Sequence, residues 1–213
     1  MPLAEQRDPT LASGSAAAPE PGGLMSRSAL NLPNIITLSR LLLAVFLFWL
    51  IDAGAHPLWA LIVFAMAAGT DAIDGYIARR YGIVTKIGRI LDPFADKVII
   101  GGAFMFLAVR PNSGVNAWMV ITVIGREMFV TSLRSVLEQE GKDFSAIWSG
   151  KIKMIVQCAA VAASLLYLGY ARGTEAEATW AIFRDAILWL SVVVTLYSGY
   201  EYVVRAVKMF RAG

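Results

Sequence analysis

Two pairs of aspartates occur close together in an otherwise apolar part of the chain: Asp71 and Asp74, then Asp92 and Asp96. On helices, spacings of three and four residues place each pair on one face. Four neighbouring carboxylates repel one another unless cations neutralise them, and oxygen ligands without His or Cys favour Mg²⁺ or Mn²⁺. Two such ions can bridge a phosphate and stabilise its attacking and leaving oxygens. The pattern therefore predicts a two-metal site, and a salt-bridged helix end is the simpler alternative.

The segments that carry these aspartates belong to a predicted all-α integral membrane fold. The 213 residues are 57% hydrophobic and 16% charged, whereas soluble domains are about 45–50% apolar and about 25% charged. A membrane-spanning helix needs roughly 20 mostly apolar residues. Residues 1–29 are rich in Ala, Pro, Gly and Ser, so we expect a disordered tail, with residues 30–213 forming one catalytic domain of six transmembrane helices. The six apolar segments are residues 35–51, 58–78, 90–109, 117–137, 152–170 and 186–204.

The basic residues are distributed unevenly between the two sides of this arrangement. Six spans put both termini on one side, and of the 19 Lys and Arg only Arg110, Arg172 and Arg184 fall on the other. Cytoplasmic loops carry the excess of Lys and Arg, so the aspartates should face the cytoplasm. The net charge of +3 then reflects topology and contact with phosphates or anionic lipid, and we expect no nucleic acid partner. Interface tryptophans are expected at the opposite ends: Trp59, Trp118 and Trp180.

The aspartates also belong to a longer motif, Asp71-x2-Asp74-Gly75-x2-Ala78-Arg79-x8-Gly88-x3-Asp92-x3-Asp96. This motif resembles the signature of the CDP-alcohol phosphotransferase family at every defined position, and the resemblance spans residues 31–205. It implies a six-helix membrane fold, usually a homodimer, in the bacterial inner (cytoplasmic) membrane. The family moves a phosphatidyl or similar group from a CDP-linked donor to an alcohol and releases CMP.

The resemblance also implies roles for individual residues. The four aspartates would bind two divalent ions, and Asp96 would additionally accept the proton of the attacking hydroxyl. Asn34 and Thr37, three residues apart near the start of the first segment, can reach the nucleotide, although a helix cap is an equally good explanation of Asn34. The other residues expected to bind the CDP donor are Gly75, Ala78, Arg79, Thr85 and Gly88.

A second group of basic residues indicates the acceptor. Arg126 and Arg134 lie eight residues apart on one helix face, and Lys151 begins the next helix. Phosphate oxygens are well bound by Arg and Lys donors, so this basic wall predicts a phosphorylated alcohol. The pattern resembles the phosphatidylglycerophosphate synthase branch of the family, whose donor is CDP-diacylglycerol and whose acceptor is sn-glycerol 3-phosphate. We attribute Lys153 to the membrane edge and to anionic lipid.

Other functions stay open at this point. The same chemistry can use inositol phosphate, serine or phosphatidylglycerol as the acceptor, the last as in cardiolipin synthase. A divalent cation transporter is a more distant alternative, but transporters place carboxylates near the bilayer midplane in repeated halves. These aspartates lie at one edge, and the chain has no internal repeat. At the opposite edge, we expect Arg184 and Asp185 to be solvated.

Overall fold

The structure is a computed structural model that describes residues 32–54, 56–81, 86–140 and 148–211. Within these ranges the side chains of residues 32–34, 36, 71–81, 86–90 and 92 lie outside the description. Every described element is helical, which confirms the predicted all-α class. The elements are α1 (Leu32–Asp52), α2 (Pro57–Tyr81), α3 (Lys86–Val109), α4 (Ala117–Gln139), α5 (Trp148–Leu166), the π-helical turn η2 (Tyr167–Ala171) and α6 (Glu177–Arg211).

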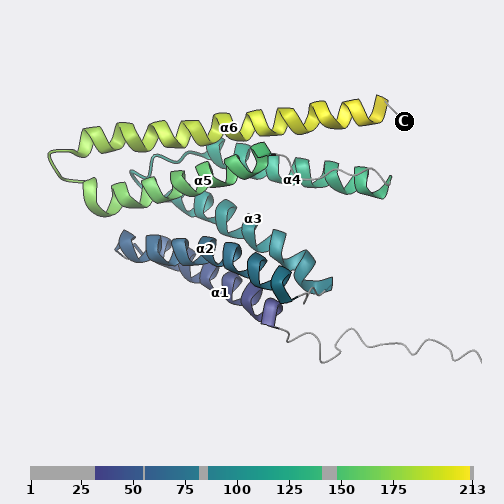
Figure 1. Ribbon diagram of the computed structural model, residues 1–213. Coiled ribbons are helices and arrows are strands. Elements are labelled where there is room, and N and C mark those ends of the chain that lie inside the picture. The colour runs from purple at the N-terminus through teal and green to yellow at the C-terminus, as the bar shows by residue number, and fades with distance from the viewer. Residues whose placement is uncertain (1–31, 55, 82–85, 141–147, 212–213) are drawn as a thin grey trace, which may run out of the picture.

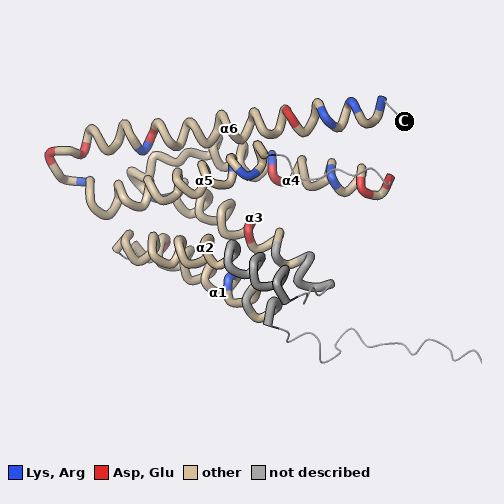
Figure 2. The backbone as a smooth tube through the Cα atoms, in the orientation of Figure 1, with Lys and Arg blue, Asp and Glu red and all other residues tan. Residues whose placement is uncertain are grey.

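Successive helices run in opposite directions (Figure 1), so the chain alternates between the two ends of the bundle. Helix α1 packs on α2 and α3, while α5 packs on α6, and α4 lies against α3 and α6. The C-terminal ends of α2, α4 and α6 and the N-terminal ends of α1, α3 and α5 therefore point toward the same end of the molecule in Figure 1. Figure 2 shows that Lys and Arg of the described residues gather mainly toward this end. Both aspartate pairs are on helices at the same end.

The hydrophobic core is formed mainly by α1, α2 and α3, with contributions from α4, α5 and α6. Leu47 of α1 and Phe104 and Leu107 of α3 are fully buried within it. Phe48 of α1 stacks on Phe106 of α3 with 5.0 Å between the ring centroids. A smaller cluster joins α4 to α6 near the C-terminus and consists of Val130, Leu137, Tyr202 and Ala206. The two clusters fix the positions of α3, α4 and α6. These three helices carry polar side chains at the end of the bundle where Lys and Arg gather.

Helix α6 has small polar side chains on its inner face and large apolar ones on its outer face. Ser191, Thr195 and Ser198 are buried, whereas Trp189 and Leu196 are exposed, as are other apolar residues on α6. A helix in water has the reverse arrangement, and transmembrane helices pack through small and polar residues. Within the described residues, α5 with η2 (Trp148–Ala171) and α6 are long and apolar enough to cross a membrane, and Pro57–Thr70 is a shorter apolar stretch. These features indicate a membrane protein.

The structure corrects the expectation that Arg184 is solvated. Its side chain is buried, donates from Nη1 to the carbonyl of Asn112 at 2.7 Å, and lies over the ring of Tyr167 at 4.1 Å. Arg184 also donates from Nε to Asp185 at 2.8 Å, and only Asp185 remains half exposed. The buried guanidinium thus connects α6 with the segment before α4 and with η2, a role that depends on tertiary contacts. Trp59, Trp118 and Trp180 are exposed near the starts of α2, α4 and α6, as expected.

Candidate active site

The four aspartates lie on two helices that contact each other. Helix α2 is continuous through Asp71 and Asp74, and α3 is continuous through Asp92 and Asp96. The spacings therefore do place each pair on one face of a helix. The side chains of the first three aspartates lie outside the described residues. Among described side chains, no group of three carboxylate, His or Cys ligands could hold a metal, so the two-metal site stays a prediction.

Most residues expected to bind the CDP donor also lie where side chains are not described. Thr85 falls outside the described residues altogether. Thr37 is described: it is buried on the inner face of α1, one turn before the buried Arg40. Its nucleotide role remains a prediction, as do those of the residues whose backbone alone is described: Asn34, Gly75, Ala78, Arg79 and Gly88.

Asp96 pairs with an arginine from another helix. Arg40 of α1 is 1% exposed and donates from Nη2 to Oδ1 of Asp96, whose side chain is 28% exposed. Nε of Arg40 donates to the carbonyl of Ala67 in α2 at 3.3 Å. One guanidinium thus connects α1, α2 and α3 and fixes the carboxylate of Asp96 at the edge of a cavity. The ion pair is stronger than a neutral hydrogen bond because both groups are charged.

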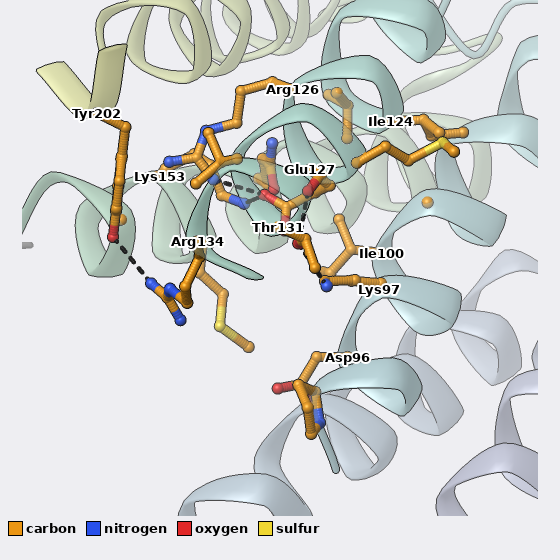
Figure 3. A pocket seen from close by; sticks show the side chains of 18 of the residues that line it. Asp96, Lys97, Ile100, Ile124, Arg126, Glu127, Thr131, Arg134, Lys153 and Tyr202 are labelled. Carbon is orange, nitrogen blue, oxygen red and sulfur yellow. Dashed lines mark hydrogen bonds and ion pairs between the residues drawn. The ribbon is translucent and has the colours of Figure 1, made fainter. Parts of the chain in front are cut away.

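The cavity has a volume of about 540 Å³ and opens between α3, α4, α5 and α6. We call it the basic cavity, because the charged side chains around it are mainly Lys and Arg. It brings Asp96 together with all three residues expected to bind the acceptor phosphate: Arg126, Arg134 and Lys151. Figure 3 shows Asp96 at one edge, with Arg134 and Tyr202 at another and Lys97 between Asp96 and α4. Glu127, Thr131, Gly150 and Lys153 also line the cavity.

A carboxylate organises the deeper wall of the basic cavity. Oε1 of Glu127 accepts from Nη1 of Arg126 at 2.8 Å and also from Nζ of Lys153. Nη2 of Arg126 donates to Oγ of Ser198 at 2.6 Å. Both terminal nitrogens of Arg126 are therefore held by protein groups. Lys153, attributed above to the membrane edge, is instead buried and paired inside the cavity.

The outer wall holds cations that have fewer protein partners. Nη2 of Arg134 donates to the hydroxyl of Tyr202 at 3.3 Å. Lys97 donates to Oγ1 of Thr131 at 2.7 Å. Exposed Lys151 has its Nζ 5.0 Å from the ring of Trp148. Because these cations keep donors facing the cavity, the outer wall can receive an anion such as a phosphate.

Arg40 and Tyr202 belong to this site and are given no role in the sequence predictions. Arg40 could be identified from the sequence as a candidate site residue, because a charged residue inside an apolar segment is functional by default. No sequence feature identifies Tyr202, since aromatic residues are common throughout the last apolar segment. It belongs to the site only because α6 packs beside α4.

Comparison with known proteins agrees with the resemblance carried by the aspartate motif. The sequence profile of a family described as CDP-alcohol phosphatidyltransferase matches residues 30–197. A Bacillus subtilis protein named CDP-diacylglycerol–glycerol-3-phosphate 3-phosphatidyltransferase is 39% identical over 187 residues, covering 81% of this chain and 93% of its own.

Two further relatives come from other bacterial groups. A Mycobacterium tuberculosis protein named probable phosphatidylglycerophosphate synthase is 36% identical over 199 residues, covering 91% of this chain and 90% of its own. A Rickettsia felis protein with the same name as the Bacillus one is 32% identical over 187 residues, covering 84% of this chain and 97% of its own. The similarity thus includes both the aspartate helices and the helices around the basic cavity.

Proposed function

Since the chain belongs to the CDP-alcohol phosphatidyltransferase family, we propose that it transfers a phosphatidyl group from CDP-diacylglycerol to sn-glycerol 3-phosphate. The products are phosphatidylglycerophosphate and CMP. The names of its bacterial relatives support this choice of donor and acceptor. The single observation that carries the proposal is the basic cavity, in which Asp96 shares one space with Arg134, Lys151 and Arg126.

The basic cavity suits a small phosphorylated alcohol. A phosphate monoester brings up to two negative charges, and the outer wall offers it Arg134 and Lys151. Charge-assisted hydrogen bonds from these donors would hold the phosphate and leave the hydroxyl end of the acceptor directed toward α3. Serine and phosphatidylglycerol do not carry a terminal phosphate monoester, so they would leave these cations unpaired.

The proposed reaction is a substitution at phosphorus. The primary hydroxyl of the acceptor attacks the phosphorus that carries the diacylglycerol, and the bond from this phosphorus to the oxygen of CMP breaks. Asp96 accepts the hydroxyl proton, and CMP departs with the electron pair of the broken bond. General-base assistance of this kind contributes about 10²- to 10⁴-fold to a rate. Arg40 holds the Asp96 carboxylate at the cavity edge, where the acceptor hydroxyl would arrive.

The chain's donor set fits the divalent ions that the family resemblance implies. Four carboxylates on two adjacent helices are hard oxygen ligands, which suit Mg²⁺ or Mn²⁺. We propose that Asp71, Asp74, Asp92 and Asp96 hold two such ions. When bound, the ions would neutralise the pyrophosphate and stabilise the charge on departing CMP. Arg79 on α2 would add a fixed positive charge beside the same group.

The placement in the membrane follows from the same proposal. All six helices would cross the bacterial inner membrane as one catalytic domain of residues 30–213, with the active site facing the cytoplasm. The acyl chains of the donor then stay in lipid, while the cytidine and the acceptor approach from water. The charged end seen in Figure 2 supports this orientation, and the family resemblance adds a homodimer to the proposal.

An acceptor panel tests the proposed function. Purified protein is given CDP-diacylglycerol, Mg²⁺ and one acceptor at a time, and release of CMP is measured. We expect release with sn-glycerol 3-phosphate and at least about 100-fold less with inositol phosphate, serine or phosphatidylglycerol, because unpaired or misplaced charges weaken binding. Equal turnover with any of these alternatives would reject the proposed acceptor. Replacement of Mg²⁺ by a chelator should abolish release.

A further inference from the structure

Tyr202 occupies an unusual position between two arginines of the basic cavity. Its ring is 5.2 Å from Cζ of Arg126 and 6.0 Å from Cζ of Arg134. Its hydroxyl also accepts from Nη2 of Arg134 at 3.3 Å. The side chain comes from α6 and is 2% exposed, so it is fixed by packing against α4. Figure 3 shows its hydroxyl directed at Arg134.

The two arginines differ in how many donors remain for a ligand. Arg126 uses Nη1 on Glu127 and Nη2 on Ser198. Nε of each arginine is buried without a hydrogen-bond partner among the described residues. For Arg134 the structure gives only the Nη2 bond to Tyr202 and the ring contact, so within the described chain Nη1 of Arg134 has no protein acceptor. Arg134 is therefore the arginine that can bind an anion, and Arg126 is held in place behind it.

The contacts around Tyr202 restrict Arg134 to one orientation. An arginine side chain has several rotatable bonds, and ordering it costs side-chain entropy. The contact with a buried ring and the hydrogen bond to the hydroxyl order the guanidinium before the ligand arrives, so binding costs less entropy. Gly150 of α5 leaves room for the hydroxyl, since a Cβ there would lie 3.3 Å from it. Arg134 is thus held by Tyr202 of α6, and Gly150 of α5 leaves the space for the Tyr202 hydroxyl.

We propose that Tyr202 is a positioning residue that presents Arg134 to the phosphate of the acceptor, an inference that rests on the proposed function of the basic cavity. Tyr202 touches neither the donor nor the reacting hydroxyl, and it acts through the orientation of the Arg134 guanidinium. Its removal therefore weakens binding of the acceptor phosphate and leaves donor binding unchanged.

The test compares Tyr202→Phe with the wild type and with Tyr200→Phe, a matched control on the same helix whose side chain is 68% exposed. Loss of the hydrogen bond from Arg134 should raise KM for sn-glycerol 3-phosphate about 3- to 10-fold, with KM for CDP-diacylglycerol within about 2-fold. Tyr200→Phe should change neither constant. Equal increases in both constants for Tyr202→Phe, together with a lower Tm, would show a merely structural role and overturn the proposal. Unchanged values of both KM constants in Tyr202→Phe would also overturn the proposal.

A double-mutant cycle asks whether Tyr202 acts through Arg134. In an Arg134→Gln background, Tyr202→Phe should have no further effect on KM for the acceptor, because the orientation of a missing guanidinium no longer matters. Additive losses would overturn the proposal.

A binding measurement separates this inference from the proposed function. Inorganic phosphate is titrated into the purified protein by calorimetry, without donor or turnover. Tyr202→Phe should weaken phosphate binding by the same 3- to 10-fold. If the wild type released no CMP with glycerol 3-phosphate but this weakening were observed, the proposed function would fail and the inference would stand. Unchanged phosphate affinity would reject the inference whatever the acceptor.

Discussion

Asp96 has a protein cation as its partner before any substrate or ion arrives. Arg40 reaches it from α1 and is itself almost completely buried. A buried guanidinium is stable only when it is paired, so the two side chains depend on each other. The pair holds the proposed base at the rim of the basic cavity, opposite the cations that would bind the acceptor phosphate.

Asp96→Asn should retain binding of CDP-diacylglycerol and lose nearly all turnover. An amide keeps the shape of the side chain but cannot accept the hydroxyl proton, so kcat should fall about 10²- to 10⁴-fold. Donor affinity and kcat are measured on the same preparation. Asp52→Asn, at the exposed far end of α1, is the control and should behave as wild type. Substantial residual activity in Asp96→Asn would remove Asp96 from the role of base.

Arg40→Met should lower the free energy of unfolding by about 1–3 kcal/mol, because it removes the ion pair between a buried guanidinium and the partly exposed Asp96. The midpoint of thermal unfolding in detergent provides the measurement. Lys208→Met, at an exposed position near the end of α6, should change stability by no more than about 0.5 kcal/mol. Equal midpoints for Arg40→Met and wild type would show that the ion pair does not stabilise the fold.

At the residue scale, the sequence indicates candidate residues where the signal is local, and the metal and substrate roles assigned to them stay predictions. The aspartates and the residues Arg126 and Arg134 stand out because charged groups are costly in apolar segments. The attribution of Lys153 to the membrane edge is wrong. Its partner Glu127 is 26 residues away in the sequence, so the local pattern does not indicate the pair. Tyr202 lies 68 residues from Arg134, and no spacing within one helix connects them.

At the scale of elements, α1 and α3 pack closely against each other at Gly102. A Cβ added at Gly102 would overlap the ring of Phe48, whereas one at the neighbouring Gly101 would lie 3.5 Å from the nearest atom, Cγ1 of Ile124. Glycine at position 102 therefore allows the rings of Phe48 and Phe106 to stack between the two helices.

Gly102→Ala should destabilise the protein by about 1–3 kcal/mol, because overpacking moves α1 away from α3. Gly101→Ala is the matched control and should be close to neutral. Thermal unfolding of both variants in the same detergent makes the comparison. A destabilisation of Gly101→Ala as large as that of Gly102→Ala would contradict this account of the α1–α3 contact.

The helices themselves were largely predictable, and their ends were not. Six apolar segments separated by Gly and Pro correspond one to one with α1 to α6. The last segment was predicted as residues 186–204, yet α6 runs from Glu177 to Arg211. Charged residues at both ends of α6 interrupt the apolar pattern, so the pattern does not predict the extension. Glu177 there accepts from the hydroxyl of Tyr167 at 2.9 Å, a contact that only the folded chain provides.

At the scale of the whole molecule, the alternating helices predict which positions are accessible from each side of the membrane. The sole cysteine is replaced by Cys158→Ser, and single cysteines are introduced by Glu175→Cys and Lys208→Cys. We expect a membrane-impermeant maleimide to label intact spheroplasts at position 175 only, and to label position 208 after permeabilisation. Labelling of position 208 in intact spheroplasts would contradict the proposed orientation.

We propose that the molecule joins a donor site on α2 and α3 to an acceptor cavity between α3, α4, α5 and α6. Asp96 would belong to both, because it lies on α3 and lines the basic cavity. In the proposed mechanism, this shared position would bring an acceptor hydroxyl to the phosphorus of a lipid-anchored donor at one end of the bundle.

The most direct test of this claim follows the phosphate of the acceptor into lipid. Purified protein is incubated with CDP-diacylglycerol, Mg²⁺ and sn-glycerol 3-phosphate labelled with ³²P, and the lipid product and CMP are quantified together. The account predicts one labelled phosphatidylglycerophosphate for each CMP released. Release of CMP without label in the lipid fraction, or the absence of both products from folded protein, would contradict it.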